Sequence, residues 1–451
     1  MPGEPPIVDV AVVGAGISGL TTAFYLGRGG LRVAVLEASD RVGGAISTER
    51  RDGFLFELGP NTVTESRAEM RQLVRDAGLE GERLEAAPVG KQRFLWKSGR
   101  LHALPASPPA FLATRLFPLR AKLRLLREPW IAKAPEGVEE TVGDFVRRRL
   151  GVDLLDYAVA PFVSGVYAGD PERLAVRWAV PRIHSLETEH GSLIRGALAR
   201  RKGPAPGGAM FSFPDGLEAL PRRLAERVGD VRLRSAVRAI ARHANGWRLT
   251  LDGGEVRARW VVSAVPADVA AELLAAVSGE RSRLLAELVY APVVVVALGF
   301  DRGAVGHPLD GFGFLAPRKE DLRVLGCLFP SSLFPGRAPE GKVTLTAFLG
   351  GRTDPGAIDL DDRQLLDAVL GDLRRSVGVR GEPLVVAIRR WRRAIPQYEV
   401  GYGRFVDRLQ ELEQALPGLS IGGNLRGGVS VPDCVKSSAA LAAQILRQAA
   451  S

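Results

Sequence analysis

The chain has 451 residues, 46% hydrophobic and 25% charged, which is enough for two or three domains that each bury an interior. Its longest apolar stretch, 289–300, contains Pro292 and is much shorter than the ~20 residues of a membrane-spanning helix. The net charge of +10 favours an anionic partner. Lysines and arginines are spread along the chain without a nucleic-acid-binding motif, so we expect a membrane surface or a carboxylate-bearing ligand and no nucleic acid.

The first residues lack the basic start, apolar stretch and cleavage site of a secretory signal. Cys327 and Cys434 are far apart in sequence and have neither disulfide nor metal-ligand spacing, and the five histidines have no ligand spacing either. We therefore expect a cytoplasmic protein with no bound metal.

The first predicted strand, Val8 to Val13, is an almost continuous apolar run, typical of a strand covered on both faces of a parallel sheet. It leads into a glycine-rich turn and a predicted helix from Ile17. In such a turn, backbone approaches a pyrophosphate closely, and the helix start directs free N–H groups at the phosphates. The residues predicted to contact the dinucleotide here are Gly14, Ala15, Gly16, Ser18 and Gly19.

The second predicted strand, 32–36, ends at Glu37, which Ala38 follows. A carboxylate at this place accepts hydrogen bonds from the adenosine ribose hydroxyls and disfavours the 2′-phosphate of NADP. The continuation indicates FAD rather than NAD, because two more glycines let a second piece of backbone close over the pyrophosphate. A later strand and turn would then approach the flavin ring. The residues predicted here are Arg41, Gly43, Gly44, Gly59, Pro60 and Asn61.

Helices are predicted from about Pro105 to Arg200. Apolar residues recur on one helical face at Leu112, Leu116, Leu119, Leu123, Leu126 and Trp130, whereas Arg115, Arg120, Lys122, Arg124 and Arg127 lie mostly elsewhere. One interpretation is a core helix with a solvated charged side, which Pro118 would kink or interrupt. The other is a basic helix that lies on anionic lipid.

The remaining elements alternate in character. A helix follows 213–217, and a hairpin of 247–251 and 256–265 turns at Asp252-Gly253-Gly254. Residues 291–391 are predicted as strands of an antiparallel substrate-binding sheet. Glycine-rich segments and a final helix end the chain, and the N-terminus of that helix can face the flavin C2 oxygen. Predicted flavin contacts here are Gly423, Asn424, Val429, Ser430 and Val431.

The first sixty residues resemble the amine oxidase and phytoene desaturase superfamily of flavoproteins, in which the backbone at the position of Val237 lies against adenine. The resemblance implies an α/β fold with a Rossmann-like FAD-binding domain (1–81, 212–270 and 408–451). It also implies an antiparallel-sheet substrate-binding domain (82–104 and 271–407) and an inserted helical domain that can associate with a membrane (105–211). No histidine or cysteine lies in an attachment motif of this superfamily, so non-covalent FAD is predicted.

Within the superfamily the chain is most similar to the oxygen-dependent protoporphyrinogen oxidase family. The segments that carry this resemblance are 56–61, 105–109, 134–137, 165–171, 311–315, 331–339, 395–398 and 428–434. It implies oxidation of a porphyrinogen by six electrons, with hydride transfer to flavin N5, O2 as acceptor and H2O2 as product, in haem biosynthesis. Apart from flavin N5, no catalytic group is predicted.

The resemblance also implies substrate contacts: apolar walls at Leu315, Leu328 and Phe348, a propionate partner at Arg93, and backbone near Gly165 for pyrrole N–H groups. Without it, each would be read as a core or surface residue. Pro432 departs from the Asn of many protoporphyrinogen-oxidising members and occurs in relatives that act on coproporphyrinogen. Coproporphyrinogen III oxidase therefore stays open, as do an amine oxidase, a desaturase and a non-catalytic flavin- and porphyrin-binding protein. The sequence is compatible with a homodimer but does not specify the oligomeric state.

Overall fold

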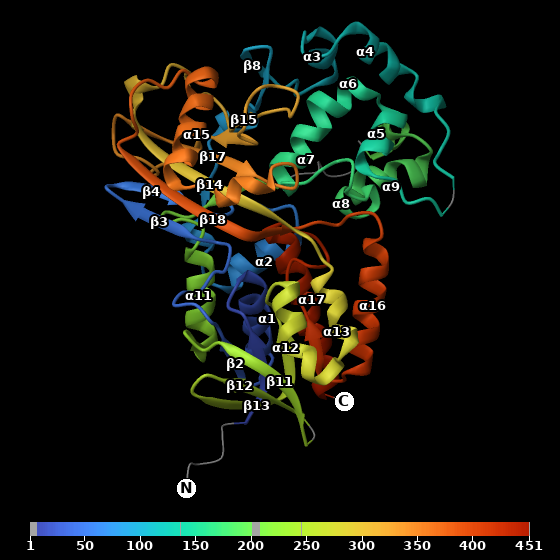
Figure 1. Ribbon diagram of the computed structural model, residues 1–451, viewed down its shortest axis with the longest axis vertical. Helices are drawn as coiled ribbons and strands as arrows, with labels where there is room; N and C mark the ends of the chain where they lie inside the picture. The colour runs from blue at the N-terminus through green and yellow to red at the C-terminus, as the bar shows by residue number, and fades with distance from the viewer. Residues whose placement is uncertain (1–6, 136, 201–207, 245, 451) are drawn as a thin grey trace.

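The computed structural model describes residues 7–135, 137–200, 208–244 and 246–450. Its α/β fold contains two large sheets, one in each half of the molecule as drawn in Figure 1, and a group of helices beside the upper sheet. The predicted fold class is thereby confirmed.

The lower sheet has the strand order β10-β2-β1-β13-β12-β11, and β19 pairs with the C-terminal end of β13. Strands β10, β2, β1, β13 and β19 run parallel, while β11, β12 and β13 form antiparallel pairs that include the predicted hairpin. The strands are β1 (Ile7–Val13), β2 (Val33–Leu36), β10 (Val231–Arg232), β11 (Val237–His243), β12 (Gly246–Leu251), β13 (Gly254–Ser263) and β19 (Leu419–Ile421).

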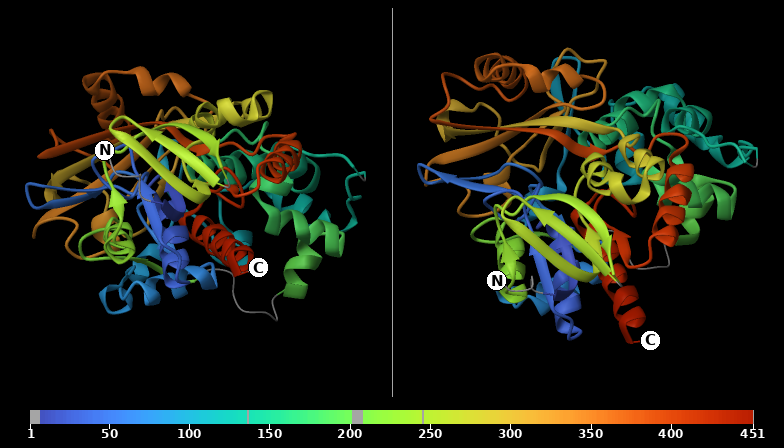
Figure 2. Two further views of the ribbon diagram at one scale, coloured as in Figure 1. Left: turned by 90° about the horizontal axis from the view of Figure 1, so that it is seen from below. Right: turned by 60° about the horizontal axis from the view of Figure 1, so that its bottom comes forward.

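Helices cover both faces of this sheet because successive residues of its central strand point to opposite sides. Val10 and Val12 pack on one face, against α1 (Ile17–Arg28) and α17 (Val431–Ala450), which lie side by side (Figure 2). Ala11 and Val13 pack on the other. The helices there are α12 (Ala267–Ser278), α13 (Glu280–Ala286) and α16 (Tyr402–Ala415).

The upper sheet has the order β18-β14-β17-β16-β15-β7-β8 and is antiparallel except between β15 and β7. Its strands are β7 (Phe94–Lys97), β8 (Arg100–Ala103), β14 (Tyr290–Asp301), β15 (Gly313–Leu315), β16 (Gly326–Leu328), β17 (Lys342–Gly350) and β18 (Val385–Pro396). The prediction of strands alone over 291–391 was incomplete. Helix α15 (Asp362–Ser376), which begins at an Asp361 and Gln364 capping box, covers one face of the sheet.

Smaller elements join the two halves. The hairpin of β3 (Thr48–Arg51) and β4 (Phe54–Glu57) packs its phenylalanines against the upper sheet. A three-stranded sheet is built from β5 (Val63–Thr64), β6 (Leu84–Glu85) and β9 (Met210–Ser212). Short helices α2 (Ala68–Asp76), α11 (Ala219–Val228) and α14 (Pro330–Leu333) complete these connections.

The predicted helical segment does contain helices, but 112–130 is not one continuous helix. Helix α3 (Pro108–Ala113) and α4 (Leu119–Leu126) are separated by 114–118, and Pro118 is the N-cap of α4, where its missing N–H costs no helical hydrogen bond. The other helices are α5 (Val142–Arg149), α6 (Val152–Leu154), α7 (Ala160–Tyr167), α8 (Val176–Ala179), α9 (Pro181–His190) and α10 (Leu193–Arg200). Leu116 is buried, but Leu112, Leu119, Leu123, Leu126 and Trp130 are 52–79% exposed, so the core-helix interpretation was wrong.

Glu57, at the end of β4, is a buried carboxyl group between the two sheets. It accepts hydrogen bonds from the Thr48 hydroxyl (2.8 Å) and the Leu217 N–H (2.7 Å), and the Arg337 guanidinium lies 3.9 Å away. Burial raises the pKa of Glu57 to about 7, and the charge of Glu218 also raises it, against the lowering effect of these donors and of Arg337. The folded protein therefore keeps a proton that the unfolded chain releases near pH 4.5.

From this group, stability is expected to fall as pH rises from 4.5 to about 7 and then to level off, because the folded state binds more protons across that window. Glu57→Gln, which keeps the shape without a titrating proton, should flatten this decline in urea-unfolding free energy. Glu226→Gln, at an exposed glutamate of α11, is the matched control, and its unfolding free energy should decline with pH as that of the wild type does. If the unfolding free energy of Glu57→Gln falls as steeply with pH as that of the control, Glu57 is not the group responsible.

Candidate flavin and substrate site

Four parallel strands end in one row at the same edge of the lower sheet. Leu36 pairs with Val13, Val13 with Ser263, and Ser263 with Ile421. The Gly14 N–H donates to the Leu36 carbonyl, and the Gly422 N–H donates to the Ser263 carbonyl, both at 2.8 Å. Segments far apart in sequence therefore meet at the carboxyl edge, where open α/β sheets bind their ligands.

The first glycine turn is tightly constrained on one side and open on the other. Gly14 has a φ of +101°, and a Cβ at Gly19 would lie 2.0 Å from the Gly14 carbonyl oxygen, so helix and turn need glycine at both positions. At Gly16 the nearest atom to such a Cβ is Gly44 Cα, 3.9 Å away. Of the residues from Gly14 to Ser18, only Gly16 is not buried, so the backbone at Gly16 borders open space at the start of α1.

Glu37 lies directly beside this turn. Its carboxylate accepts hydrogen bonds from the Ala15 N–H (2.7 Å) and the Ser39 N–H (2.9 Å), and Ala38 next to it is exposed. The Ser235 N–H donates to the Glu37 carbonyl at 2.8 Å, which brings Val237 close to the predicted ribose site.

A second glycine loop is held against the first. The Gly43 N–H donates to the Ala15 carbonyl at 2.8 Å. The Arg41 guanidinium donates to the carbonyls of Val42, Gly44 and Ile46, at 2.5–3.1 Å. Arg41 therefore shapes this loop through carbonyl oxygens, while Gly44 itself stays exposed.

The predicted flavin turn packs under the same loop. A Cβ at Gly59 would lie 1.9 Å from the Ala45 carbonyl oxygen, so only glycine fits there. Beyond Pro60, the Asn61 Nδ2 donates to the Gly59 carbonyl at 3.0 Å. The Asn61 Oδ1 is buried and has no hydrogen-bond partner among the described residues, which is uncommon for a buried acceptor.

The third loop leads from β19 to α17 and includes Gly423, Asn424 and 429–431. Gly423 has a φ of +99°, and no atom of the described residues lies within 4 Å of a Cβ placed on it. The Ser430 hydroxyl accepts a hydrogen bond from the Asp433 N–H at 3.3 Å where α17 begins. The start of a 20-residue helix thus lies directly after this loop, flanked by Val429 and Val431.

Two tyrosines hold this third loop, and sequence reasoning gave them no role. The Tyr398 hydroxyl donates to the Asn424 carbonyl and the Tyr402 hydroxyl to the Leu425 carbonyl, both at 2.6 Å. Their rings are stacked with centroids 4.2 Å apart. The adjacent Gln397 Nε2 donates to the Tyr167 carbonyl at 2.9 Å, so one segment ties the third loop to the helical region. No local sequence pattern marks these long-range contacts.

These loops fit a dinucleotide with a flavin. Bare glycine backbone at Gly16, Gly44 and Gly423, a carboxylate at Glu37 and an unpartnered acceptor at Asn61 surround one sheet edge. The contacts of individual residues with FAD stay predictions. In the described part of the chain, no cluster of His, Cys, Asp and Glu could hold a metal ion.

The predicted substrate walls share one face of the upper sheet. Gly326 pairs with both Phe348 and Leu315, and Leu328 lies in the neighbouring row. All three large side chains are half-buried, whereas Phe314, Cys327 and Ala347 on the opposite face are buried in the core that α15 covers. A Cβ at Gly165 would lie 2.4 Å from Leu315 Cδ2, so α7 approaches this face.

Arg93 lies just before β7, near the far side of the same sheet. Its guanidinium lies over the Phe312 ring, 5.3 Å from the centroid, and its side chain is exposed. Among the described residues, no carboxylate forms an ion pair with it. A cation is thus present, without a competing anion, where the resemblance implies a propionate partner.

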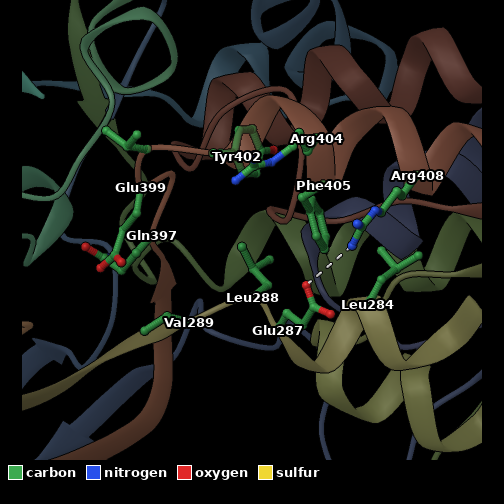
Figure 3. Close-up of a pocket in the computed structure, with 12 residues that line it drawn as sticks. Leu284, Glu287, Leu288, Val289, Gln397, Glu399, Tyr402, Arg404, Phe405 and Arg408 are labelled. Carbon is green, nitrogen blue, oxygen red and sulfur yellow. Dashed lines mark ion pairs between the residues drawn. The ribbon is translucent and has the colours of Figure 1, made fainter. Parts of the chain in front are cut away.

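A separate cavity of about 360 Å³ lies between α13, α16 and the segment 397–401 (Figure 3). Arg408 and Glu287 form an ion pair across it at 3.9 Å. It contains none of the predicted flavin or substrate residues.

Comparison with known proteins decides the family. Residues 17–446 match the family described as flavin containing amine oxidoreductase. The chain belongs to this family. It is an FAD-dependent oxidoreductase, and among flavoproteins it belongs with the protoporphyrinogen oxidases and amine oxidases.

Among its curated relatives, protoporphyrinogen oxidase of Oryza sativa subsp. japonica chloroplasts is 35% identical, over 98% of this chain and 89% of the relative. Coproporphyrinogen III oxidase of Bacillus subtilis (strain 168) is 30% identical, over 97% of each chain. A crystal structure from Exiguobacterium sp. 255-15 superposes with a TM-score of 0.86 at 28% identity, covering 98% of this chain and 99% of that one. Cyclohexylamine oxidase from Brevibacterium oxydans, at 19% identity and a TM-score of 0.72 over 99% and 100%, shares the fold.

Glu37→Ala should weaken FAD binding by about 1.5 to 3 kcal/mol, or one to two decades in Kd, because a charged acceptor for the ribose is lost. Quenching of flavin fluorescence on titration into apoprotein measures this. Thermal unfolding of the apoprotein separates the effect from loss of the brace to Ala15. Unchanged affinity in a folded variant would show that Glu37 does not hold the ribose, and flavin that stays on the denatured chain would contradict non-covalent binding.

Proposed function

We propose that the protein oxidises protoporphyrinogen IX to protoporphyrin IX in haem biosynthesis, with O2 as electron acceptor and H2O2 as product. The observation that carries this proposal is the apolar face formed by Leu315, Leu328 and Phe348, whose side chains are all half-buried. A flat apolar macrocycle would cover this face. The names of the relatives support the same substrate class.

The same sheet face also reaches the flavin turn. Trp391 on β18 donates its Nε1–H to the Leu58 carbonyl at 2.6 Å, next to Gly59. Bound FAD supplies the chemistry by accepting hydride at N5. The chain's own residues position the reactants: apolar walls exclude water from the macrocycle, and Tyr398 and Tyr402 fix the loop before α17. This division of labour requires no acid–base pair.

Coproporphyrinogen III is the second candidate substrate. Pro432 and the relative from Bacillus subtilis favour it, and its four propionates in place of two would demand more cations than Arg93 alone. Porphyrin fluorescence with each porphyrinogen in turn compares the two directly. Faster turnover of protoporphyrinogen IX is expected; faster turnover of coproporphyrinogen III would replace the first proposal with the second.

Arg93→Ala should lower kcat/KM by about one to two decades, because a charge-assisted bond of about 1.5 to 3 kcal/mol is lost. Since the Arg93 side chain is exposed, we expect a decrease closer to one decade. Phe348→Ala should lower kcat at least as much as it weakens binding, because hydride transfer needs close alignment. FAD content should not change in either. Arg363→Ala, an exposed arginine of α15, is the control. If Arg93→Ala turns over both porphyrinogens at the wild-type rate, Arg93 is a surface charge that does not bind the substrate.

We also propose that the protein works in the cytoplasm and binds anionic membrane surfaces through an apolar ridge, formed by Leu112, Leu119, Leu123, Leu126 and Trp130. The basic residues beside the ridge are Arg115, Arg120, Lys122, Arg124 and Arg127. Of these five, only Arg120 has a carboxylate partner in the described structure. No helix in the described part of the chain is long and apolar enough to cross a membrane, so the proposed contact is peripheral.

A buried ion network fixes the end of the ridge at Trp130. Glu128, two residues before Trp130, is fully buried and accepts hydrogen bonds from the Ser192 hydroxyl and the Leu193 N–H, at 2.5 and 2.9 Å. Arg149, also fully buried, donates to Glu128 at 3.1 Å and to Glu187 at 2.8 Å. These contacts fix the chain next to Trp130, whose side chain stays 79% exposed.

Vesicle flotation should show binding to anionic lipid that weakens with salt, because each basic residue near such a surface contributes up to ~1 kcal/mol. The double variant Leu123→Glu with Leu126→Glu should lose most of it. Leu384→Glu, at an exposed leucine outside the ridge, is the matched control and should bind as the wild type does. Equal binding to neutral and anionic vesicles, or binding to neither, would refute the electrostatic part.

A further inference from the structure

Strand β18 carries four arginines in five residues, Arg389, Arg390, Arg392 and Arg393 around Trp391. Three of them pair with aspartates: Arg390 with Asp362 (2.7 Å), Arg392 with Asp359 (2.9 Å) and Arg393 with Asp268 (2.7 Å). Among the described residues, no carboxylate forms an ion pair with Arg389. One charge of this run is therefore left without an internal counterion.

Arg389 lies on the face of the upper sheet that carries Leu315, Leu328 and Phe348. Arg389 pairs across β14 with Val295, which pairs in turn with Phe348, so the three share one row. This is the face opposite α15. Arg389 is half-buried there. A partly desolvated cation without an anion is costly, so this position suits an anionic ligand.

Contacts on either side of Arg389 place it at the flavin turn. Its guanidinium lies over the Trp391 ring, 5.6 Å from the centroid, and Trp391 donates to the Leu58 carbonyl. On the other side, Ala387 on the same face packs with Phe56 and Leu58. Arg389 thus lies between two residues that touch the segment leading to Gly59.

The second glycine loop lies on the same side. Burial lowers the pKa of Arg41, and the charge of Arg389 lowers it further, although Glu218 acts against both. Arg41 donates to carbonyls of 42–46, the loop joined to the start of α1 through Gly43 and Ala15. The positive charges of Arg41 and Arg389 thus act on each other near the loop that is predicted to bind phosphate. The charges suit a diphosphate.

The substrate carboxylate is the less suitable anion. Arg93 precedes β7, which is five strands from β18 in the sheet order. Five spacings of ~4.8 Å put roughly 24 Å between the two arginines. A propionate partner at Arg93 therefore leaves Arg389 at the opposite side, next to the glycine loops.

We propose that Arg389 binds the diphosphate of FAD, so that the substrate sheet itself supplies a ligand to the cofactor. The proposal requires FAD but does not depend on which porphyrinogen is oxidised. FAD then bridges the two sheets, and cofactor binding stabilises the position of the face that carries Phe348.

Titration of apoprotein with FAD tests this without any turnover. Arg389→Gln should raise the FAD Kd about 10- to 100-fold, because a charge-assisted contact is lost. Arg389→Lys should lie between, since lysine keeps the charge but not the planar fork. Arg390→Gln, one residue away on the opposite face and paired with Asp362, is the matched control and should stay within about twofold of wild type.

Competition with ADP identifies the contacted group. Because ADP carries the diphosphate without the flavin, Arg389→Gln should weaken ADP by a factor similar to that for FAD. Unchanged FAD affinity in Arg389→Gln would overturn the proposal. If Arg389→Gln does not fold, unchanged FAD affinity in Arg389→Lys would overturn it instead. So would a loss confined to FAD, which would point to the flavin ring, or a raised KM for porphyrinogen at unchanged FAD affinity.

Discussion

The common end of four parallel strands is the constraint on which the rest of the molecule depends. Leu36, Val13, Ser263 and Ile421 lie in one row, and their partners are fixed by backbone hydrogen bonds rather than by side chains. A shift of one residue in any of these strands would move a glycine loop by about 3.3 Å and turn its side chains to the other face. The positions of the glycine loops are thus set by the register of the sheet. The glycines themselves allow the tight turns and close backbone approach at those positions.

The chemistry that we propose for the upper sheet depends on its connections to the glycine loops. Trp391 and the phenylalanines of β4 join it to the flavin turn, and Gln397 with Tyr398 joins the helical region to the loop before α17. Each of these contacts links residues distant in sequence. A rigid arrangement of this kind suits the proposed reaction, in which the flavin accepts hydride and the protein aligns the reacting atoms.

The sequence predicted the parts whose signal is local. The turn after β1, the acid after β2, the hairpin at Asp252 and the helix breaks at Pro118 all follow from residue types within a few positions. It missed α15, because its amphipathic pattern lies within a strand-rich region, and it gave no role to Tyr398, Tyr402 or Arg389. Their partners are set by tertiary packing, and four arginines of one strand look alike until their aspartates are placed. The apolar ridge could be read as a surface only once its exposure was known.

We propose that a porphyrinogen on the face of Phe348 reduces a flavin held at the row of Val13 and Ser263. Anaerobic mixing of the FAD-loaded protein with protoporphyrinogen IX, followed by flavin absorbance, tests it most directly, because oxygen and product release play no part. We expect the oxidised flavin band to bleach at a rate that increases with porphyrinogen concentration to saturation, and to return when O2 is admitted. A flavin that stays fully oxidised with protoporphyrinogen IX and with coproporphyrinogen III would contradict it.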